Sequence, residues 1–191
     1  TTTGGWTANN LTDMSYFLYG TALRSLNVFL HGGATGADVS NIKNMAYAFA
    51  NMKQLTDADG LELWLPTSSV ADPLNLTGLF QGDTALEIVR GLKNWVIPGA
   101  NLTDMFSGCS KLHTLDIHSM DMRDMTVTNM FANCSALGDY TKGGYIRVSA
   151  LTRLTDCGLQ NAPNRTTKDG MWLRLGEDPI GWFGSSNQFI Q

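Results

Sequence analysis

The three histidines are the first residues of this chain that could perform chemistry. His31 lies in the Gly-rich stretch HGGATG, which lacks the Lys and the glycine spacing of a phosphate-binding loop. His113 and His118 flank an alternating segment, so a strand there would place them on opposite faces. Asp116 and His118 share a face, but a pair of ligands does not make a metal site. We therefore expect neither a metal nor a cofactor.

A catalytic set is equally hard to assemble. No spacing singles out a Ser or Cys nucleophile with its base, and no pattern places two carboxylates across a pocket. We therefore predict that the protein is not an enzyme.

The three cysteines carry positional information. Cys109 and Cys134 each stand three residues after a Phe in two copies of one motif, and Cys157 fits that column with a slip of one residue. If neighbouring copies stack about 5 Å apart, as paired strands do, Cys109 and Cys134 are neighbours within disulfide reach. A Cys109–Cys134 disulfide and a ladder of buried thiols both fit this spacing.

Asn-x-Ser/Thr sequons are more frequent than chance predicts, and they occur at Asn10, Asn75, Asn101, Asn133 and Asn164. In a secreted eukaryotic protein they would accept N-linked glycans. Alternatively, the repeated motif itself contains Asn-Leu-Thr, and no sugar is attached. The sequence leaves both interpretations open.

These residues belong to a motif that recurs along the chain. Its clearest copies are LTGLFQGDTAL (76–86), LTDMFSGCSKL (102–112) and VTNMFANCSAL (127–137), and related copies occupy 11–23 and 44–55. The Phe positions are 17, 49, 80, 106 and 131. Steps of roughly 25 to 32 residues are typical of solenoids, in which each copy buries its apolar residues against the next. We therefore predict a buried column formed by Phe49, Phe80, Phe106 and Phe131.

An alternating stretch follows each copy and indicates a half-buried strand, as in Leu115-Asp116-Ile117-His118. The LTDMF segment predicts a short helix or 3₁₀ turn capped by Thr103, after which Gly108 or Asn133 turns the chain. The stretch TDADG after Leu55 is interpreted as a loop insertion.

The predicted fold is an α/β repeat, a solenoid with about five or six short parallel strands on one face and short helices or 3₁₀ turns on the other. We divide the chain into an N-terminal arm (1–9), a repeat solenoid of about six coils (10–175) and a C-terminal cap or tail (176–191).

Strand alternation also predicts which side chains face outward. With Leu61, Leu63 and Leu65 inward, Glu62 and Trp64 point out. Exposed aromatic and Arg residues are enriched where proteins bind partners. The predicted binding face comprises Phe29, Glu62, Trp64, Arg90, Asp116, His118, Arg147 and Arg174.

The composition argues against two kinds of partner. The formal net charge is −4, whereas nucleic-acid binding requires clustered Lys and Arg. No apolar run approaches the roughly 20 residues that span a bilayer, so we expect no membrane insertion. The chain begins TTTGGWT without an initiator Met, which we interpret as processing, trimming or an incomplete sequence.

The phrases NLTDMFSGCSKLHTLDI and VTNMFANCSAL resemble the BspA-type leucine-rich-like repeat of surface proteins, whose pattern is Val-Thr-x-Met-x-x-Met-Phe-x-x-Cys-x-x-Leu followed by Leu-x-Leu. The resemblance covers most of the chain. It implies a curved, leucine-rich-repeat-like parallel solenoid, a location outside the cell or on its surface, and a non-enzymatic role. It also favours the ladder of cysteines over the disulfide.

We therefore expect an extracellular repeat protein that binds a surface glycan or protein through its strand face. The alternative is a self-assembling subunit of an extracellular, glycosylated fibre, in which copies of the chain are the partner; an enzyme accessory or phage receptor-binding module is a weaker option. On the first hypothesis, combining Trp64→Ala with Arg147→Glu abolishes adhesion without loss of stability.

Overall fold

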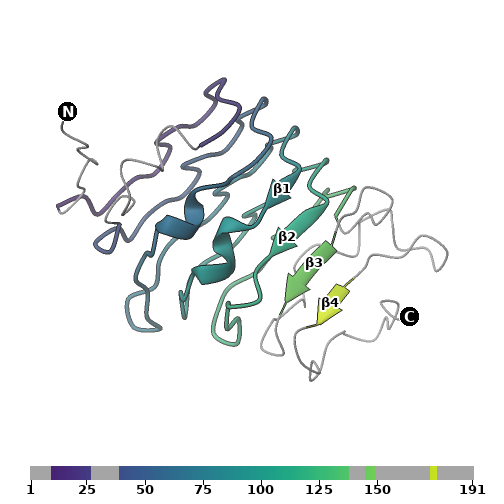
Figure 1. Ribbon diagram of the computed structural model, residues 1–191. Coiled ribbons are helices and arrows are strands. Elements are labelled where there is room, and N and C mark those ends of the chain that lie inside the picture. The colour runs from purple at the N-terminus through teal and green to yellow at the C-terminus, as the bar shows by residue number, and fades with distance from the viewer. Residues whose placement is uncertain (1–9, 27–38, 138–144, 149–172, 176–191) are drawn as a thin grey trace, which may run out of the picture.

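The computed structural model describes residues 10–26, 39–137, 145–148 and 173–175 of the chain. Strands β1 (Ile88–Val89), β2 (Thr114–Asp116), β3 (Tyr145–Val148) and β4 (Leu173–Leu175) form a parallel sheet in the order β1-β2-β3-β4 (Figure 1). Two 3₁₀ turns, η1 (Leu61–Leu63) and η2 (Gly91–Asn94), lie before and after β1 in the chain. The predicted arm (1–9) and tail (176–191) lie outside the described residues.

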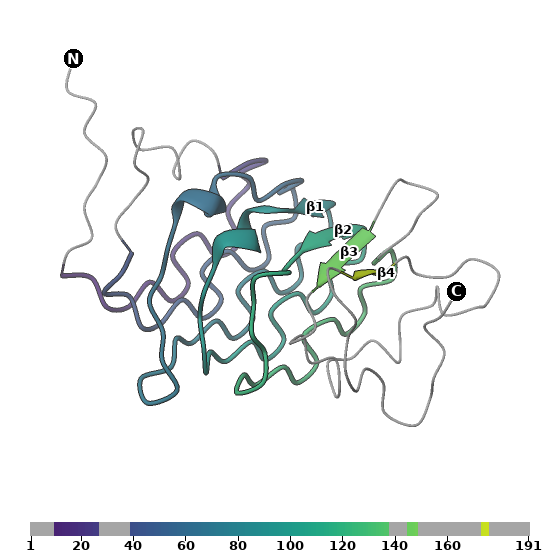
Figure 2. The ribbon, with the colours of Figure 1, turned by 60° about the horizontal axis from the view of Figure 1, so that its bottom comes forward.

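Two ladders of parallel backbone pairing connect successive copies of the motif. The first contains the sheet and extends toward the N-terminus through the bridges Ser25–Asp57 and Asp57–Ile88. The second ladder joins Asp13, Asn44, Asn75, Asn101 and Thr126. Because both ladders step from one copy to the next, the described copies lie side by side in sequence order (Figure 2). The assignment of residues 10–175 to one solenoid of about six coils stays a prediction.

The LTDMF segment and its counterparts form successive β-turns instead of the predicted helix or 3₁₀ turn. In copy 102–112, the Met105 N–H donates to the Leu102 carbonyl (3.1 Å) and the Cys109 N–H to the Phe106 carbonyl (3.0 Å). The third residue of each turn has positive φ, as type II turns require. These residues are Tyr16 and Gly20, Tyr47 and Asn51, Gly78 and Gly82, Asp104 and Gly108, and Asn129 and Asn133. Left-handed residues at these two positions interrupt a helix, which explains the difference.

Every second backbone N–H group of a turn segment donates to a backbone carbonyl group of the next copy. In copy 102–112, residues 102, 104, 106 and 108 donate to carbonyl groups of residues 126, 128, 130 and 132 at 2.7–2.9 Å. The same alternation joins residues 76–82 to 101–107, 45–51 to 75–81 and 14–20 to 44–50. Each turn segment therefore depends on its neighbour for backbone hydrogen bonds as well as for apolar burial.

The predicted Phe column is confirmed. Phe49, Phe80, Phe106 and Phe131 are fully buried, and consecutive ring centroids lie 5.6, 5.5 and 5.9 Å apart. The Phe80 and Phe106 rings are nearly parallel, with an interplanar angle of 3°, and the Phe106 and Phe131 rings make an angle of 7°. The column gives neighbouring copies a continuous aromatic core.

Copy 11–23 joins this column in a register different from the predicted one. Leu18 donates its N–H to the Ala48 carbonyl, as Phe49 does to the next copy, and Leu18 is buried. Phe17 is 43% exposed. The alignment of Phe17 with Phe49 was therefore wrong by one residue. Tyr16 and Tyr47 both have positive φ and occupy the same turn position, so the residue equivalent to Phe49 is Leu18.

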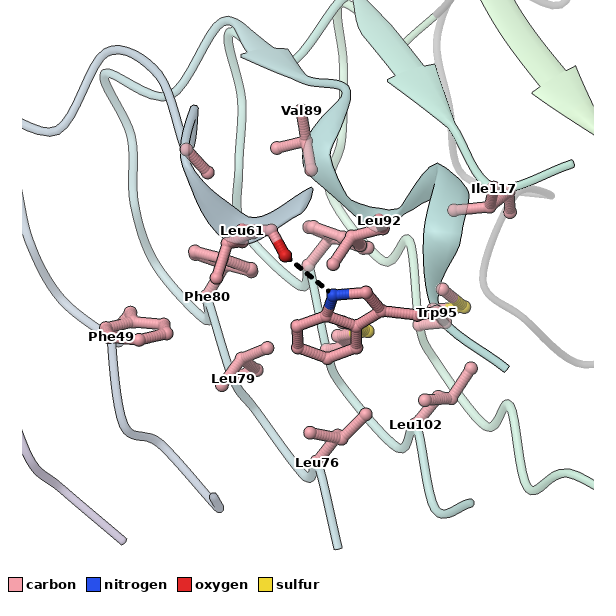
Figure 3. Packing of buried hydrophobic residues seen from close by; sticks show 14 of the residues in the cluster. Phe49, Leu61, Leu76, Leu79, Phe80, Val89, Leu92, Trp95, Leu102 and Ile117 are labelled. Atoms are coloured by element: carbon pink, nitrogen blue, oxygen red, sulfur yellow. Dashed lines mark hydrogen bonds between the residues drawn. The ribbon is translucent and has the colours of Figure 1, made fainter. Parts of the chain in front are cut away.

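The predicted orientation of Trp64 is wrong. Residues 61–63 form the 3₁₀ turn η1, in which side chains do not alternate as they do in a strand. Trp64 is consequently fully buried, while Leu65, predicted to face inward, is 58% exposed. Trp95 follows η2 in the same way and donates from Nε1 to the Leu61 carbonyl at 2.9 Å (Figure 3). The two indoles thus belong to the core.

Candidate functional site

One row of residues crosses the strands at the positions that follow the buried core residues of β2 and β3. The parallel register pairs Asp116 with Arg147, and Arg147 with Arg174, as the sequence alternation predicts. Leu115 and Ile146 are buried, and successive residues of a strand alternate between faces, so we expect this row on the face opposite the core. Arg90 directly follows β1 and lies beside Asp116 in this register, and the Asp57–Ile88 bridge extends the row to Asp59. We call Asp59, Arg90, Asp116, Arg147 and Arg174 the strand-side row.

Glu62 does not belong to this row, contrary to the prediction. The Asp57–Ile88 bridge aligns Asp59 with Arg90, three residues before Glu62. The stretch TDADG is therefore the strand-side segment of its copy and not a loop insertion. Glu62 instead lies in η1, is half-buried, and accepts the Gly60 N–H at 2.8 Å through Oε2.

Asp116 was predicted to face a ligand, but only 5% of it is exposed. Its Oδ1 lies 2.5 Å from His118 Nδ1 and also accepts the His118 N–H (3.3 Å). His118 is half-buried, so the pair orients the imidazole at the edge of the sheet. Asp116 therefore positions a neighbour instead of offering an open carboxylate. His113, by contrast, contacts Thr114 Oγ1 through Nδ1 at 3.0 Å.

Arg90 and Lys93 are the cations that remain open to solvent beside the row. Both are exposed, and neither makes an ion pair within the described part of the chain. Lys93 lies in η2, one 3₁₀ turn after Arg90. The sequence analysis missed Lys93 because it read this segment as a strand. Phe29 lies outside the described residues, as do the side chains of Arg147 and Arg174.

The sequon asparagines of the motif have structural roles. Asn75 Oδ1 accepts the N–H and the hydroxyl of Thr77 at 3.1 and 2.7 Å, and Asn101 Oδ1 accepts those of Thr103 at 3.0 and 2.7 Å. Asn75 Nδ2 donates to Asn44 Oδ1 at 3.1 Å. The Asn-x-Thr spacing thus builds an Asx-turn at the start of a copy. Thr103, predicted to cap a helix, is a donor in this turn.

The remaining sequons differ in their surroundings. Asn10 and Asn133 are exposed, and Asn133 is the left-handed residue of a turn (φ 62°). Asn164 lies outside the described residues. N-linked glycans at any of the five sites stay a prediction.

Cys109 and Cys134 occupy equivalent places in neighbouring copies and are not joined by a disulfide. Each buried thiol donates to the Phe carbonyl of the preceding copy, at Phe80 and Phe106 respectively, with both distances 3.0 Å. Burial raises the pKa of the Cys109 thiol, so it stays protonated. The ladder of thiols is therefore the arrangement present. Cys157 lies outside the described residues.

Asp83 occupies the position that cysteine has in the next two copies, and the sequence analysis missed its burial. It is fully buried, its Oδ1 accepts the Met52 N–H at 2.7 Å, and its Oδ2 has no hydrogen-bond partner. Burial raises the pKa of this carboxyl to about 9, although the Met52 hydrogen bond and the Lys53 charge act to lower it. Asp83 is therefore a neutral acid at pH 7.

An aromatic patch on the first two copies also escaped the sequence analysis. The rings of Tyr16 and Tyr47 stack at 5.2 Å, and Tyr19 tilts against Tyr16 at 5.4 Å. Tyr19 accepts a hydrogen bond from Asn51 Nδ2 at 2.7 Å. A Cβ on Gly78 would lie 2.3 Å from the Tyr47 ring, so this glycine makes room for it. The sequence feature that could have predicted this patch is a Tyr at the same turn position in both copies, Tyr16 and Tyr47.

Within the described ranges, no group of three or more His, Cys, Asp and Glu side chains is arranged to hold a metal ion. Over the same residues, no helix has the length and apolar character needed to cross a membrane.

Comparison with curated proteins and with solved structures gives no significant match. A family model described as "Mycoplasma protein of unknown function, DUF285" matches residues 21–143. The matched region contains the copies from 44–55 to 127–137, together with β1 and β2. Because this match covers more than half of the chain, the protein belongs to the DUF285 family.

Proposed function

We propose that this protein is a non-enzymatic, BspA-type repeat protein that works outside the cell or on its surface. In this proposal the chain is a leucine-rich-repeat-like solenoid, and its strand-side row contacts a glycan or protein on another surface. The observation that carries the proposal is the parallel backbone register, which aligns Arg147 and Arg174 with the exposed Arg90. Trp64 is not part of the contact surface, because it is buried.

A rigid platform beneath the row supports this proposal. The parallel pairing of β1 to β4 fixes the spacing of the row, and the Asp116–His118 pair fixes its centre. A surface held in this way loses little conformational freedom when it binds a partner.

The proposal is tested by reversing the exposed charges beside the row. We expect Arg90→Glu combined with Lys93→Glu to lose binding to a printed glycan array and to matrix glycoproteins coated on plates. Both side chains are exposed, so the melting temperature should stay within a few degrees. The matched control combines Lys111→Glu with Arg123→Glu, two exposed cations that lie outside the row. Equal binding by the two double variants would exclude the strand-side row as the contact.

Assembly of the chain into a fibre is the second candidate, and the first copy supplies the observation that favours it. Exposed apolar residues that gather on one face often mark a contact with another molecule. Copy 11–23 exposes Leu11, Tyr16, Phe17 and Tyr19. Electron microscopy and light scattering of Tyr16→Ser combined with Tyr19→Ser test this candidate. It requires fibres or oligomers in the unaltered protein and their loss in the variant; monomers in both would exclude it.

A further inference from the structure

The backbone hydrogen bonds that join neighbouring turn segments all point the same way. At each junction between the described copies, four N–H groups of one copy donate to carbonyl groups of the next copy, at 2.7–3.0 Å. The N–H groups that alternate with these donate mainly within their own copy. Neighbouring β-strands differ, because they exchange N–H and carbonyl groups in both directions. Each turn segment therefore has a donor edge toward the following copy and an acceptor edge toward the preceding one.

In copy 11–23 the acceptor edge has no described copy in front of it (Figure 1). The carbonyl groups of Asp13, Ser15 and Tyr19 accept no hydrogen bond from the described part of the chain. The equivalent carbonyl groups of residues 44, 46 and 50 accept N–H groups of copy 11–23. This end of the described copies therefore presents carbonyl oxygens without the N–H groups found beside them on a strand edge. Peptide dipoles aligned in one direction also add, as in a helix, and their negative pole lies here.

A carboxylate adds a full negative charge to this edge. Asp13 is exposed, its Oδ1 accepts the Ser15 N–H at 2.7 Å, and its Oδ2 accepts Asn44 Nδ2 at 3.0 Å. These hydrogen bonds lower the pKa of the carboxyl, so it is ionised at neutral pH. The same ladder position holds the neutral side chains of Asn44, Asn75 and Asn101 in later copies. The charge therefore belongs to the first copy alone among these four.

The cations of the neighbouring segments do not pair with this carboxylate. Lys43 pairs with Asp72 at 2.9 Å, and Lys53 donates to the Gly82 carbonyl at 2.5 Å. Arg24 lies at the start of the other ladder, the one that contains the sheet. The first copy itself contains no Lys, Arg or His. Asp13 consequently makes no ion pair with any described residue.

Exposed aromatic rings flank the acceptor edge. Tyr16 is 56% exposed, Phe17 43% and Tyr19 47%. Tyr16 stacks on Tyr47 of the following copy at 5.2 Å, and the Tyr19 ring is tilted by 60° against that of Tyr16. The other face of the Tyr16 ring is therefore turned away from the following copy. Positive groups are attracted to the faces of aromatic rings, and a guanidinium group also stacks on them.

We propose that the acceptor edge of copy 11–23 binds an arginine-rich segment of another protein. A guanidinium group carries five N–H donors and no acceptor, so it suits carbonyl oxygens that have no N–H groups between them. Its charge suits Asp13 and the negative pole, and its plane suits the rings of Tyr16 and Tyr19. A β-strand or a second acceptor edge is less suitable, because each would set carbonyl groups against carbonyl groups. This contact is separate from the strand-side row.

The experiment compares peptides of equal length that differ in their side-chain head group. Oligoarginine carries charge and a planar fork of donors, oligolysine carries charge alone, and oligocitrulline has a planar head group without charge. Binding of the whole chain to each labelled peptide is measured by fluorescence anisotropy across a salt series. We expect oligoarginine to bind several-fold more tightly than oligolysine, and oligocitrulline not to bind. Binding should weaken with salt, because exposed charges are screened.

A pair of carboxylate substitutions assigns the binding to this edge. Asp13→Asn should weaken oligoarginine binding about fivefold, since an exposed ion pair contributes up to roughly that factor. Asparagine already occupies this ladder position in later copies, so the fold should be kept. Asp124→Asn is the matched control, because Asp124 is also exposed but lies outside copy 11–23. Binding should be unchanged in the control.

A second pair of variants tests the rings. Tyr16→Ser combined with Tyr19→Ser should weaken oligoarginine binding roughly tenfold, because two contacts between a cation and a ring are lost. Leu65→Ser combined with Val96→Ser is the matched control, since these side chains are 58% and 70% exposed and lie in other copies. Circular dichroism checks that each variant is folded.

Three outcomes would overturn the proposal. Equal affinity for oligoarginine and oligolysine would show only a general attraction of cations to an acidic protein. Equal weakening by Asp13→Asn and Asp124→Asn would place the binding elsewhere. If the unaltered protein forms oligomers that the Tyr16→Ser and Tyr19→Ser variant loses, and peptide binding does not change, a second copy covers this face instead. None of these outcomes alters the test of the strand-side row.

Discussion

At the residue scale, Asp83 makes stability depend on pH in an unusual direction. A carboxyl whose pKa is raised by burial prefers the neutral form in the folded protein. Its pKa is about 9 when folded, against about 4 in an unfolded chain. The stabilising contribution is therefore complete below pH 4 and is lost progressively as pH rises toward 9, since the unfolded chain releases the proton first.

Asp83→Asn tests this directly. The amide keeps an oxygen for the Met52 N–H but cannot ionise. We expect the variant to melt at a higher temperature than the unaltered protein at pH 8, with the difference shrinking toward pH 4. Asp72→Asn, which removes an exposed carboxylate paired with Lys43 at 2.9 Å, is the control and should show no such trend. A melting difference that does not vary with pH would mean that Asp83 is ionised in the fold.

The Asx-turn asparagines give a second prediction at this scale. Asn75→Ala removes two hydrogen bonds accepted from Thr77 and one donated to Asn44. We expect a loss of roughly 1–3 kcal/mol in the free energy of unfolding, measured by urea titration. Asn10→Ala, at an exposed sequon, should change it by less than about 0.5 kcal/mol. Equal effects at the two sites would contradict the structural role of the motif asparagine.

At the scale of the element, the paired turns explain which residues the motif tolerates after its Phe. Gly82, Gly108 and Asn133 occupy this place in successive copies, and all three have positive φ. Glycine adopts this conformation at no steric cost, and asparagine is the side chain that adopts it most readily. The choice between Gly and Asn is thus a backbone requirement and carries no information about a ligand.

Gly108 therefore offers a comparison of two substitutions at one site. We expect Gly108→Ala to cost about 1–2 kcal/mol of unfolding free energy, because alanine disfavours positive φ. Gly108→Asn should cost less, as the next copy already has Asn133 at this position. An added Cβ would meet the Gly82 Cα at 3.4 Å, so both variants meet the same neighbour. If the two substitutions cost the same, contact with Gly82 and not φ would be the cause.

At the scale of the whole molecule, stability depends on the column of Phe rings that joins the copies from 44–55 to 127–137. Phe106 stacks on Phe80 and on Phe131, so its loss weakens the contacts on both sides. In a repeat protein each copy is stabilised mainly by its neighbours. A defect in the middle of the column therefore separates two parts of one cooperative unit.

Phe106→Ala should lower the free energy of unfolding by roughly 3–5 kcal/mol, as expected for a large cavity in a packed core. Trp64→Ala should cost a similar amount, because Trp64 is buried against Phe49 with ring centroids 6.0 Å apart. This replaces the expectation that Trp64 is a surface residue. Phe17→Ala, at a 43% exposed position, serves as the control and should cost much less. The three free energies of unfolding can be measured by urea titration. If Phe106→Ala lowered this free energy no more than Phe17→Ala does, the column would not be what stabilises the fold.

The repeat itself could be recognised from the sequence, because the same apolar spacing recurs in every copy. The column of Phe49, Phe80, Phe106 and Phe131, the equivalence of Cys109 and Cys134, and the shared row of Asp116, Arg147 and Arg174 all follow from that recurrence. Each depends on local periodicity, which stacking of equivalent copies carries into space.

Only the tertiary structure decided the features in which one copy departs from another. Trp64 is buried because residues 61–63 form a 3₁₀ turn. The alternating apolar residues of this segment are also typical of a strand, so the sequence pattern did not distinguish the two. The burial of Asp83 depends on its place between two neighbouring copies, because an Asp in a turn motif would otherwise be expected at the surface. The one-residue phase of Leu18 depends on backbone hydrogen bonds to the next copy, which no single segment encodes by itself.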